Sequence, residues 1–235
     1  MRSAPALLSV FALACLGLVA CGGGESDLEG SLVIDGSAWA PGAPSMSPLG
    51  APPGTPTGDP ASLLLGMYSL YVGKNADCSQ MTLVEDHGAT PKVFDMVQNP
   101  VLFSVNPANG SYLCVALRMS DVLTAKSKTS FGSCVAGVAY TTDVYRAGQT
   151  GWVDTAGAAI VGHGTSAAPV DDHVTIVLTT DPAAAIAHGY LEDQVIALGS
   201  KLLVPSKTTL FWGGAGTVTS TASGCGIEQG SPKFQ

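Results

Sequence analysis

The chain has 235 residues, of which 46% are apolar and 12% are charged, and it carries a formal net charge of −8 at pH 7. This composition supports a sizeable core and excludes a chain that is disordered as a whole. The acidic balance argues against binding to nucleic acid or to anionic lipid, because both need a basic protein surface.

The N-terminus has the layout of an export signal. Arg2 precedes a run from Ala6 to Ala20 that is apolar or small except for Ser9. A membrane-spanning helix needs about 20 apolar residues, and this run is shorter and stops before Cys21 and three glycines. We therefore expect residues 1–20 to be cleaved.

The segment Leu18-Val19-Ala20-Cys21 resembles the lipobox of bacterial lipoproteins, in which the Cys thiol carries diacylglycerol. The resemblance implies that Cys21 begins the mature chain and that its acyl chains anchor the protein to a membrane. Cys15 matches the box less well, and an ordinary secretory signal is the alternative. Gly22 stands where that family usually marks inner-membrane retention with Asp. The resemblance therefore implies the outer membrane, on its periplasmic or its surface face.

Residues 21–60 are predicted to be a disordered tether. Three glycines open it, and a Pro- and Gly-dense stretch runs from Pro41 to Pro60. Such a composition does not bury enough apolar area to offset the entropy lost on ordering. An apolar patch around Val33 and Trp39 could pair onto the edge of the domain that follows.

Residues 61–235 are predicted to form an all-β domain. An apolar run over residues 63–72 is typical of a buried strand. Val101–Val105 and Ser111–Met119 flank Asn106–Gly110, whose Asn and Gly residues favour a hairpin. Further strands are predicted at Ser133–Thr141, Val174–Thr179, Lys201–Val204 and Thr208–Trp212.

The second arm of the predicted hairpin alternates in character. Odd-numbered residues from Leu113 to Met119 are expected on one face, and even-numbered residues from Tyr112 to Arg118 on the other. A disulfide from Cys114 should therefore join the outer face to a neighbouring strand or loop and not cross the core.

One short helix is predicted, with Asp181 as N-cap, Pro182 at the first position, Ala183–Ala187 as body and Gly189 as the stop. Many short strands and little helix predict a single antiparallel β-sandwich, immunoglobulin-like or transthyretin-like. Asn109–Asp121 resembles the G-x-Y-x-(hydrophobic) strand of surface-anchored sandwich domains and of uncharacterised bacterial lipoproteins. The resemblance implies a sandwich and no particular activity.

Four cysteines follow the proposed anchor: Cys78, Cys114, Cys134 and Cys225. In an oxidising compartment an even number of widely spaced cysteines predicts two disulfides, with three connectivities open. A zinc site is the alternative, but the chain has no C-x-x-C or C-x-x-H pair.

Gly162–Pro169 resembles the His box of subtilases fused to their Ser box. A serine-protease triad brings its residues together from distant segments, whereas His163 and Ser166 are three residues apart. The segment is therefore interpreted as a Gly-rich loop between strands. A hydrolase that uses His163 and Ser166 stays an alternative.

Asp171, Asp172 and His173, together with His163, are weak candidates for a divalent-ion site. Adjacent residues on an extended segment point to opposite faces, so at most two of the three consecutive residues aim the same way. Calcium loops also need oxygens at alternate positions. A solvated loop is the preferred interpretation, and a solvated turn is likewise expected at Asp86–His87.

These features predict a lipid-anchored cell-envelope protein with a non-enzymatic structural or partner-binding β domain. No cofactor is expected. The expected partners are the membrane, through the acyl chains on Cys21, and an envelope protein or surface ligand, but no nucleic acid. The hydrolase and the divalent-ion module are the alternatives.

Overall fold

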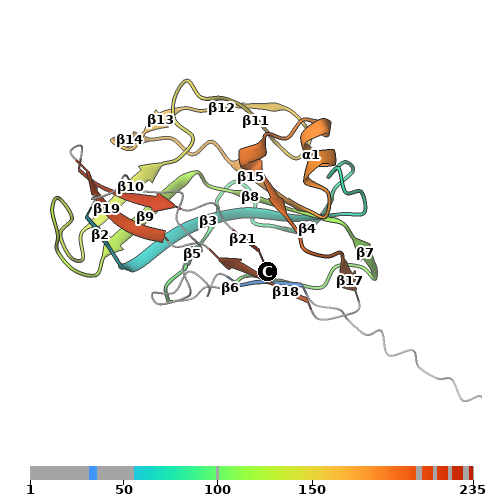
Figure 1. Cartoon of the computed structure of the whole chain (residues 1–235), viewed down its shortest axis with the longest axis horizontal. Helices are drawn as coiled ribbons and strands as arrows, with labels where there is room; N and C mark the ends of the chain where they lie inside the picture. Colours follow the sequence, from blue (N-terminus) through green and yellow to red (C-terminus); the bar gives the residue numbers. More distant parts are fainter. Residues whose placement is uncertain are drawn as a thin grey trace, which may run out of the picture.

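The computed structural model describes residues 32–35, 56–98, 101–204, 208–213, 216–221, 224–229 and 233–234. Within these ranges the chain is mostly β, with one α-helix, α1 (Pro182–His188), and one 3-10 turn, η2 (Glu192–Gln194). Figure 1 shows a curled sheet of many strands with shorter segments on both of its faces. The predicted signal peptide, residues 1–20, and Cys21 lie outside the described residues.

The strand β3 (Pro60–Gly73) is the spine of the largest sheet, and most of its residues are buried. Its neighbours all run antiparallel to it. One edge pairs with β9 (Val122–Ser127) and β8 (Cys114–Met119), and the opposite edge pairs with β5 (Lys92–Asp95) and β4 (Thr82–Asp86). The spine is buried because it is paired on both edges and covered on both faces.

Three more strands widen this sheet to eight. They are β10 (Ala139–Asp143) beside β9, β15 (Val174–Thr179) beside β8, and β16 (Val195–Ala197) beside β15. The chain passes through α1 and η2 between β15 and β16. This crossover returns the chain to the same end of the sheet, so that β15 and β16 are parallel.

The remaining strands form small sheets. The first is β21 (Lys233–Phe234), β18 (Thr208–Gly213), β1 (Leu32–Asp35) and β6 (Val101–Val105). The second is β17 (Leu202–Val204) with β7 (Gly110–Tyr112), and the third is β2 (Thr57–Gly58), β19 (Gly216–Thr221) and β20 (Gly224–Gln229). Two hairpins complete the set, β11 (Thr150–Val153) with β12 (Ala159–Val161) and β13 (Gly164–Thr165) with β14 (Ala168–Pro169).

Strand β1 corrects part of the predicted tether. It lies between β18, to which it is parallel, and β6, to which it is antiparallel, and its Leu32 is 2% exposed. The part of the apolar patch around Val33, which could have paired onto the edge of the domain, is therefore a strand inside a sheet. β2 and the start of β3 also fall before residue 61. Trp39 and residues 36–55 lie outside the described part of the chain.

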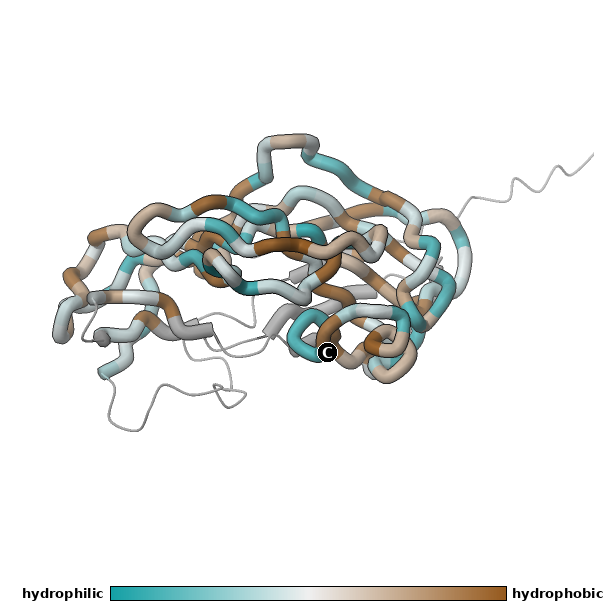
Figure 2. Tube along the Cα trace, turned by 90° about the horizontal axis from the view of Figure 1, so that it is seen from above, coloured by the Kyte–Doolittle hydropathy of each residue, from teal (hydrophilic) through white to brown (hydrophobic). Residues whose placement is uncertain are grey.

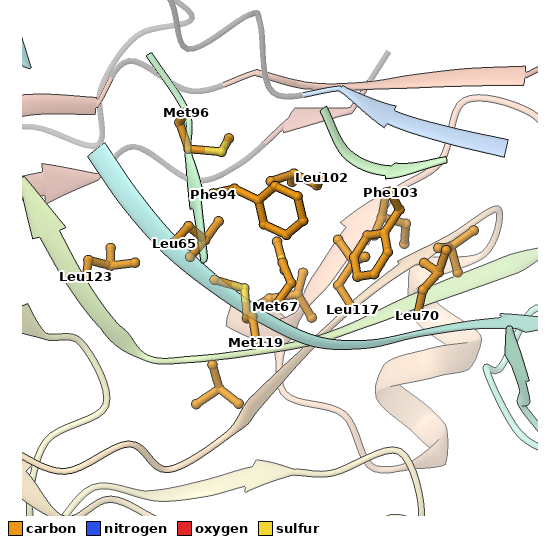
Figure 3. Close-up of a cluster of buried hydrophobic side chains, with 14 of the residues drawn as sticks. Leu65, Met67, Leu70, Phe94, Met96, Leu102, Phe103, Leu117, Met119 and Leu123 are labelled. Carbon is orange, nitrogen blue, oxygen red and sulfur yellow. The ribbon is translucent and has the colours of Figure 1, made fainter. Parts of the chain in front are cut away.

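The main core fills the space between the large sheet and the strands of the small sheets. Figure 3 shows Leu102 and Phe103 of β6 facing Met67 and Leu70 of β3, with Leu117 of β8 beside them. All five side chains are at most 2% exposed. A burial of this kind stabilises a fold by about 1.5–3 kcal/mol per large apolar side chain.

A second apolar cluster lies on the opposite face of the large sheet. It contains Cys78, Cys114, Ala116, Val177, Ala185 and Tyr190. Figure 1 shows α1 and the hairpins β11–β12 and β13–β14 on this face. The large sheet is therefore covered on both sides.

Among the described residues, no helix is long and apolar enough to span a membrane. In Figure 2 hydrophobic and hydrophilic residues alternate along the tube.

The predicted helix is confirmed. The side chain of Asp181 accepts a hydrogen bond from Ala184 N at 3.1 Å, Pro182 is the first residue, and Gly189 ends the helix at φ 131°. The N-cap satisfies a backbone donor that the first turn leaves free. His188 lies in the last turn.

The predicted hairpin across Asn106–Gly110 is wrong. Strand β6 pairs with β1, β7 pairs with β17, and β8 pairs with β3 and β15. The connection therefore passes from one sheet to another and does not turn back on itself. The hydroxyl of Tyr112 donates to Ala108 O at 2.6 Å across this loop.

Strand alternation is confirmed only after Leu113, which separates β7 from β8. Cys114, Ala116 and Arg118 lie on the outer face, whereas Val115, Leu117 and Met119 are in the main core. Tyr112 was expected on the outer face, but it also lies in the main core. The break at Leu113 shifts the alternation of inward and outward side chains by one residue, so Tyr112 faces the core although it is even-numbered.

The strands predicted at residues 63–72, 174–179, 201–204 and 208–212 correspond to β3, β15, β17 and β18. In the predicted strand Ser133–Thr141, however, only residues from Ala139 onward are a strand, β10. Residues 132–138 form turns that contain Gly132 and Gly137, both at positive φ.

The coarse fold prediction, mostly β with one short helix, is confirmed. The sheets are not purely antiparallel, because β1 and β18 as well as β15 and β16 run parallel. A closed sandwich of the immunoglobulin or transthyretin type stays a prediction.

Candidate functional site

Eight polar side chains gather on the outer face of the large sheet, where β13 and β14 lie over β10 (Figure 1). We call them the polar cluster. Its members are Tyr68, Arg118, Asp121, Asp143, His163, Asp171, Asp172 and His173. They come from three strands, from the turn between β8 and β9, and from residues 162–173, which we call the covering segment.

Tyr68 is buried against Asp171. The pairing of β3 with β8 shifts register between Met67 and Ser69, so Tyr68 is the extra residue of a β-bulge, a feature that redirects a side chain. Its hydroxyl donates to Asp171 Oδ2 at 2.7 Å. Burial, and then the hydrogen bond and negative charge of Asp171, raise the pKa of Tyr68. The hydroxyl is therefore a fixed donor at neutral pH.

Arg118 binds the ring of His173. Its Nη2 donates to His173 Nδ1 at 2.9 Å. Because a guanidinium only donates, Nδ1 must accept, and the ring is neutral with its proton on Nε2. The His173 ring also lies 3.9 Å from the Tyr68 ring, between centroids. Its backbone has φ 50°, in the left-handed region that few residues other than glycine adopt.

Two buried carboxylates hold the covering segment. Asp143 Oδ2 accepts from Val170 N at 3.2 Å, and Asp121 Oδ1 accepts from Asp172 N at 2.9 Å. These amides are two residues apart, so on an extended chain they point the same way. The two carboxylates thus accept the backbone hydrogen bonds that the carbonyl groups of a paired strand would accept in a β-sheet.

Asp121 and Asp143 are 1% and 0% exposed, and each has one oxygen without a hydrogen-bond partner, Asp121 Oδ2 and Asp143 Oδ1. Burial raises the pKa of Asp121 to about 6, and the charges of Asp143, Asp172 and Asp171 add to this rise. The hydrogen bond from Asp172 N opposes it.

His163 and Asp172 form a pair at the surface. Asp172 Oδ1 lies 2.6 Å from His163 Nδ1, and Asp172 Oδ2 accepts from His163 N at 2.5 Å. The His side chain is 63% exposed and the Asp side chain 7%. A carboxylate on Nδ1 fixes the ring tautomer and leaves Nε2 as the basic nitrogen, as in a general base.

Ser166 does not join this pair. Its hydroxyl accepts a hydrogen bond from Asp143 N at 3.3 Å, and in the described part of the chain no hydrogen bond connects it to His163. The contact between His163 and Ser166 that the alternative hydrolase would need is therefore absent there. The structure instead supplies an orienting carboxylate, Asp172, which was not assigned to His163 from the sequence.

The glycines around His163 have a packing role. A Cβ on Gly162 would lie 2.2 Å from Arg146 O, and a Cβ on Gly164 would lie 2.5 Å from Val170 N. Both positions therefore need glycine so that backbone segments can approach closely. The resemblance to the subtilase boxes has a structural explanation in these contacts.

The weak metal candidates point to different partners. Asp171 binds Tyr68, Asp172 binds His163, and His173 binds Arg118. Within the described residues, no three His, Cys, Asp or Glu side chains are grouped so that they could hold a metal ion. The three residues are also half-buried, so the predicted solvated loop is wrong at this point. Each side chain instead contacts the fold.

The predicted solvated turn at Asp86–His87 is only partly correct. Asp86 is exposed and accepts from Gly88 N, but the His87 side chain is 16% exposed. Its ring stacks on Phe103, and His87 Nε2 lies 3.2 Å from Glu85 Oε1.

The four cysteines form two disulfides, as predicted. Cys78 pairs with Cys114 on the outer face of the sheet, and Cys134 pairs with Cys225. The first pair joins β8 to the loop after β3, which agrees with the expectation that Cys114 does not cross the core.

Sequence reasoning missed Tyr68, Arg118, Asp121 and Asp143 as members of a cluster. Arg118 and Asp121 carried a weak signal, because a charged residue within or beside an apolar strand needs a buried partner. Tyr68 carried none, since only the bulge directs it to Asp171.

No protein family matches the chain, and neither a curated protein nor a solved structure is similar to it.

Proposed function

We propose that this chain is a lipid-anchored cell-envelope protein, held in the outer membrane by acyl chains on Cys21. The pairing of Cys78 with Cys114 and of Cys134 with Cys225 carries this proposal. Disulfides persist in oxidising compartments outside the cytoplasm, which is where a lipobox directs a protein.

The anchor is tested by palmitate labelling and membrane fractionation of two variants. Cys21→Ser should lose the label and leave the membrane fraction, because it removes the acylated thiol. Cys15→Ser, which changes the other signal cysteine, should keep both. If Cys21→Ser is still labelled and membrane-bound, the proposal fails.

For the domain we propose a non-enzymatic structural or partner-binding role on a β-sandwich. The polar cluster supports this role, because its hydrogen bonds hold the covering segment to the sheet. Core side chains from both the large sheet and β6 support the sandwich. Crosslinking on intact cells should recover the same envelope partner repeatedly, and recovery of only random neighbours would reject a partner-binding role.

The His163–Asp172 pair favours a second candidate, a hydrolase. An oriented imidazole with an exposed ring can act as a general base. If the pair activates a serine nucleophile, a fluorophosphonate probe should label the wild-type chain and fail to label His163→Ala. Unchanged labelling of His163→Ala rejects this candidate.

A further inference from the structure

The covering segment is held by two buried carboxylates, and in the described part of the chain neither of them has an ion-pair partner. Asp143 and Asp121 accept the amides of Val170 and Asp172, and their second oxygens are buried without a partner. A buried carboxylate without a compensating cation or donor is unfavourable in its charged form. Proton uptake removes this unfavourable charge, because a carboxylic acid is neutral.

The groups around Asp121 favour its protonated, neutral form over its charged form. Those that face the site from the neighbouring elements are Asp143 of β10, Asp171, Asp172, His163 and His173 of the covering segment, Arg118 of β8 and Tyr68 of β3. Arg118 is turned to the His173 ring, and the second nearby cation, Arg146, is exposed and donates from Nε to the backbone O of Asp143, not to its carboxylate. The acidic side chains therefore outnumber the available positive charge.

We infer that Asp121 and Asp143 form a proton-operated latch. With a proton on Asp121, the covering segment is held against the sheet, and with that carboxylate charged it opens more often.

The direction of the pH effect follows from the two states. The pKa of Asp121 is about 6 when it is buried and has its ordinary value of 3.8 when it is released to solvent. The closed state therefore holds the proton more tightly. Its advantage is complete below pH 4 and is lost as the pH rises through 6.

Opening would uncover a surface that the closed segment hides. Asp171 leaves the Tyr68 hydroxyl, and His173 leaves the Arg118 guanidinium. A tyrosine donor and an unpaired arginine suit an anionic group on a partner. The latch thus makes this surface more accessible at neutral pH than in acid.

Amide hydrogen exchange of the full chain tests the latch. The amides to follow are those of Val170 and Asp172, with rates corrected for the intrinsic pH dependence of exchange. Their protection should fall about tenfold between pH 5 and pH 8, as the shift between the two states requires. Asp121→Asn should flatten this dependence, since an amide still accepts the backbone bond but does not titrate. Asp143→Asn should weaken it, because the charge of Asp143 helps to raise the pKa of Asp121.

Asp86→Asn is the matched control, because it removes the same charge from an exposed turn and should follow the wild type. Four results overturn the latch. The first is protection that is constant with pH in the wild type, and the second is an Asp121→Asn variant that keeps the full dependence. The third is protection that millimolar Ca²⁺ restores at pH 8, which would make the pair a cation site. If both Asn variants lose protection at every pH, the pair has a purely structural role and the latch is likewise rejected.

Discussion

Two buried polar residues differ in how completely the fold satisfies their hydrogen bonds. Gln194 is 0% exposed and every hydrogen-bonding position of its amide is used, because Nε2 donates to Val153 O and Thr175 O while Oε1 accepts from Val153 N and Leu191 N. Asp121 is buried as deeply but has one oxygen without a partner. A satisfied buried amide fixes one packing arrangement, whereas a half-satisfied carboxylate makes the arrangement depend on pH.

Gln194→Glu should destabilise the protein by about 3–5 kcal/mol at pH 7, because a buried carboxylate would face two carbonyl oxygens without a proton to donate. Urea unfolding measures the change, and part of the loss should return at pH 5. Glu192→Gln changes an exposed residue of the same 3-10 turn and should have little effect. Equal stabilities of wild type and Gln194→Glu at pH 7 would contradict this role for the amide.

Gly164→Ala should cost more than Gly157→Ala, although both glycines have positive φ, 73° and 79°. The left-handed backbone costs an alanine about 1–2 kcal/mol at either site. At Gly164 the added Cβ would also lie 2.6 Å from Asp143 Oδ2, whereas at Gly157 nothing is within 4 Å. Overpacking should add about 1–3 kcal/mol to the unfolding free energy lost at Gly164. Equal losses of unfolding free energy in the two variants would show that the covering segment shifts to accommodate the added Cβ at little cost in stability.

At the scale of elements, sequence signals predicted the structure correctly where residues close in the sequence determine it. The cap, proline and glycine of α1 lie within nine residues, from Asp181 to Gly189, so the helix was predicted with its ends. The hairpin at Asn106–Gly110 failed because pairing is decided elsewhere: β1, some 70 residues earlier, takes the edge of β6. The polar cluster was not predictable for the same reason, since its members come from positions 68 to 173 and meet only when β3, β8 and β15 lie side by side.

The N-cap of α1 can be tested separately. Asp181→Ala removes the acceptor for Ala184 N and should cost about 1 kcal/mol of the unfolding free energy. Asp181→Asn removes the same charge but keeps an acceptor, so it should stay within about 0.3 kcal/mol of the wild type. If both variants lose the same amount, charge and not capping supports the helix.

At the scale of the whole molecule, the disulfides tie late parts of the chain to early ones. Cys134 lies in the connection between β9 and β10, and Cys225 lies in β20, 91 positions later. Cys78 and Cys114 are 36 positions apart and join elements that β3 already brings together. β19 and β20 belong to a sheet separate from the large one, so the longer bridge is the covalent tie that holds these C-terminal strands to it.

Removing the longer bridge should therefore be the more damaging change. With both cysteines of a pair replaced by alanine, each loss should cost about 3–5 kcal/mol, because the unfolded chain regains the entropy of an open loop. The loop of 91 residues should cost about 0.8 kcal/mol more than the loop of 36, from the logarithmic dependence on loop length. Urea unfolding of the two double variants measures this difference. A larger loss on removing Cys78–Cys114 would mean that the second core cluster around that bridge, and not chain entropy, sets the contribution of the disulfides.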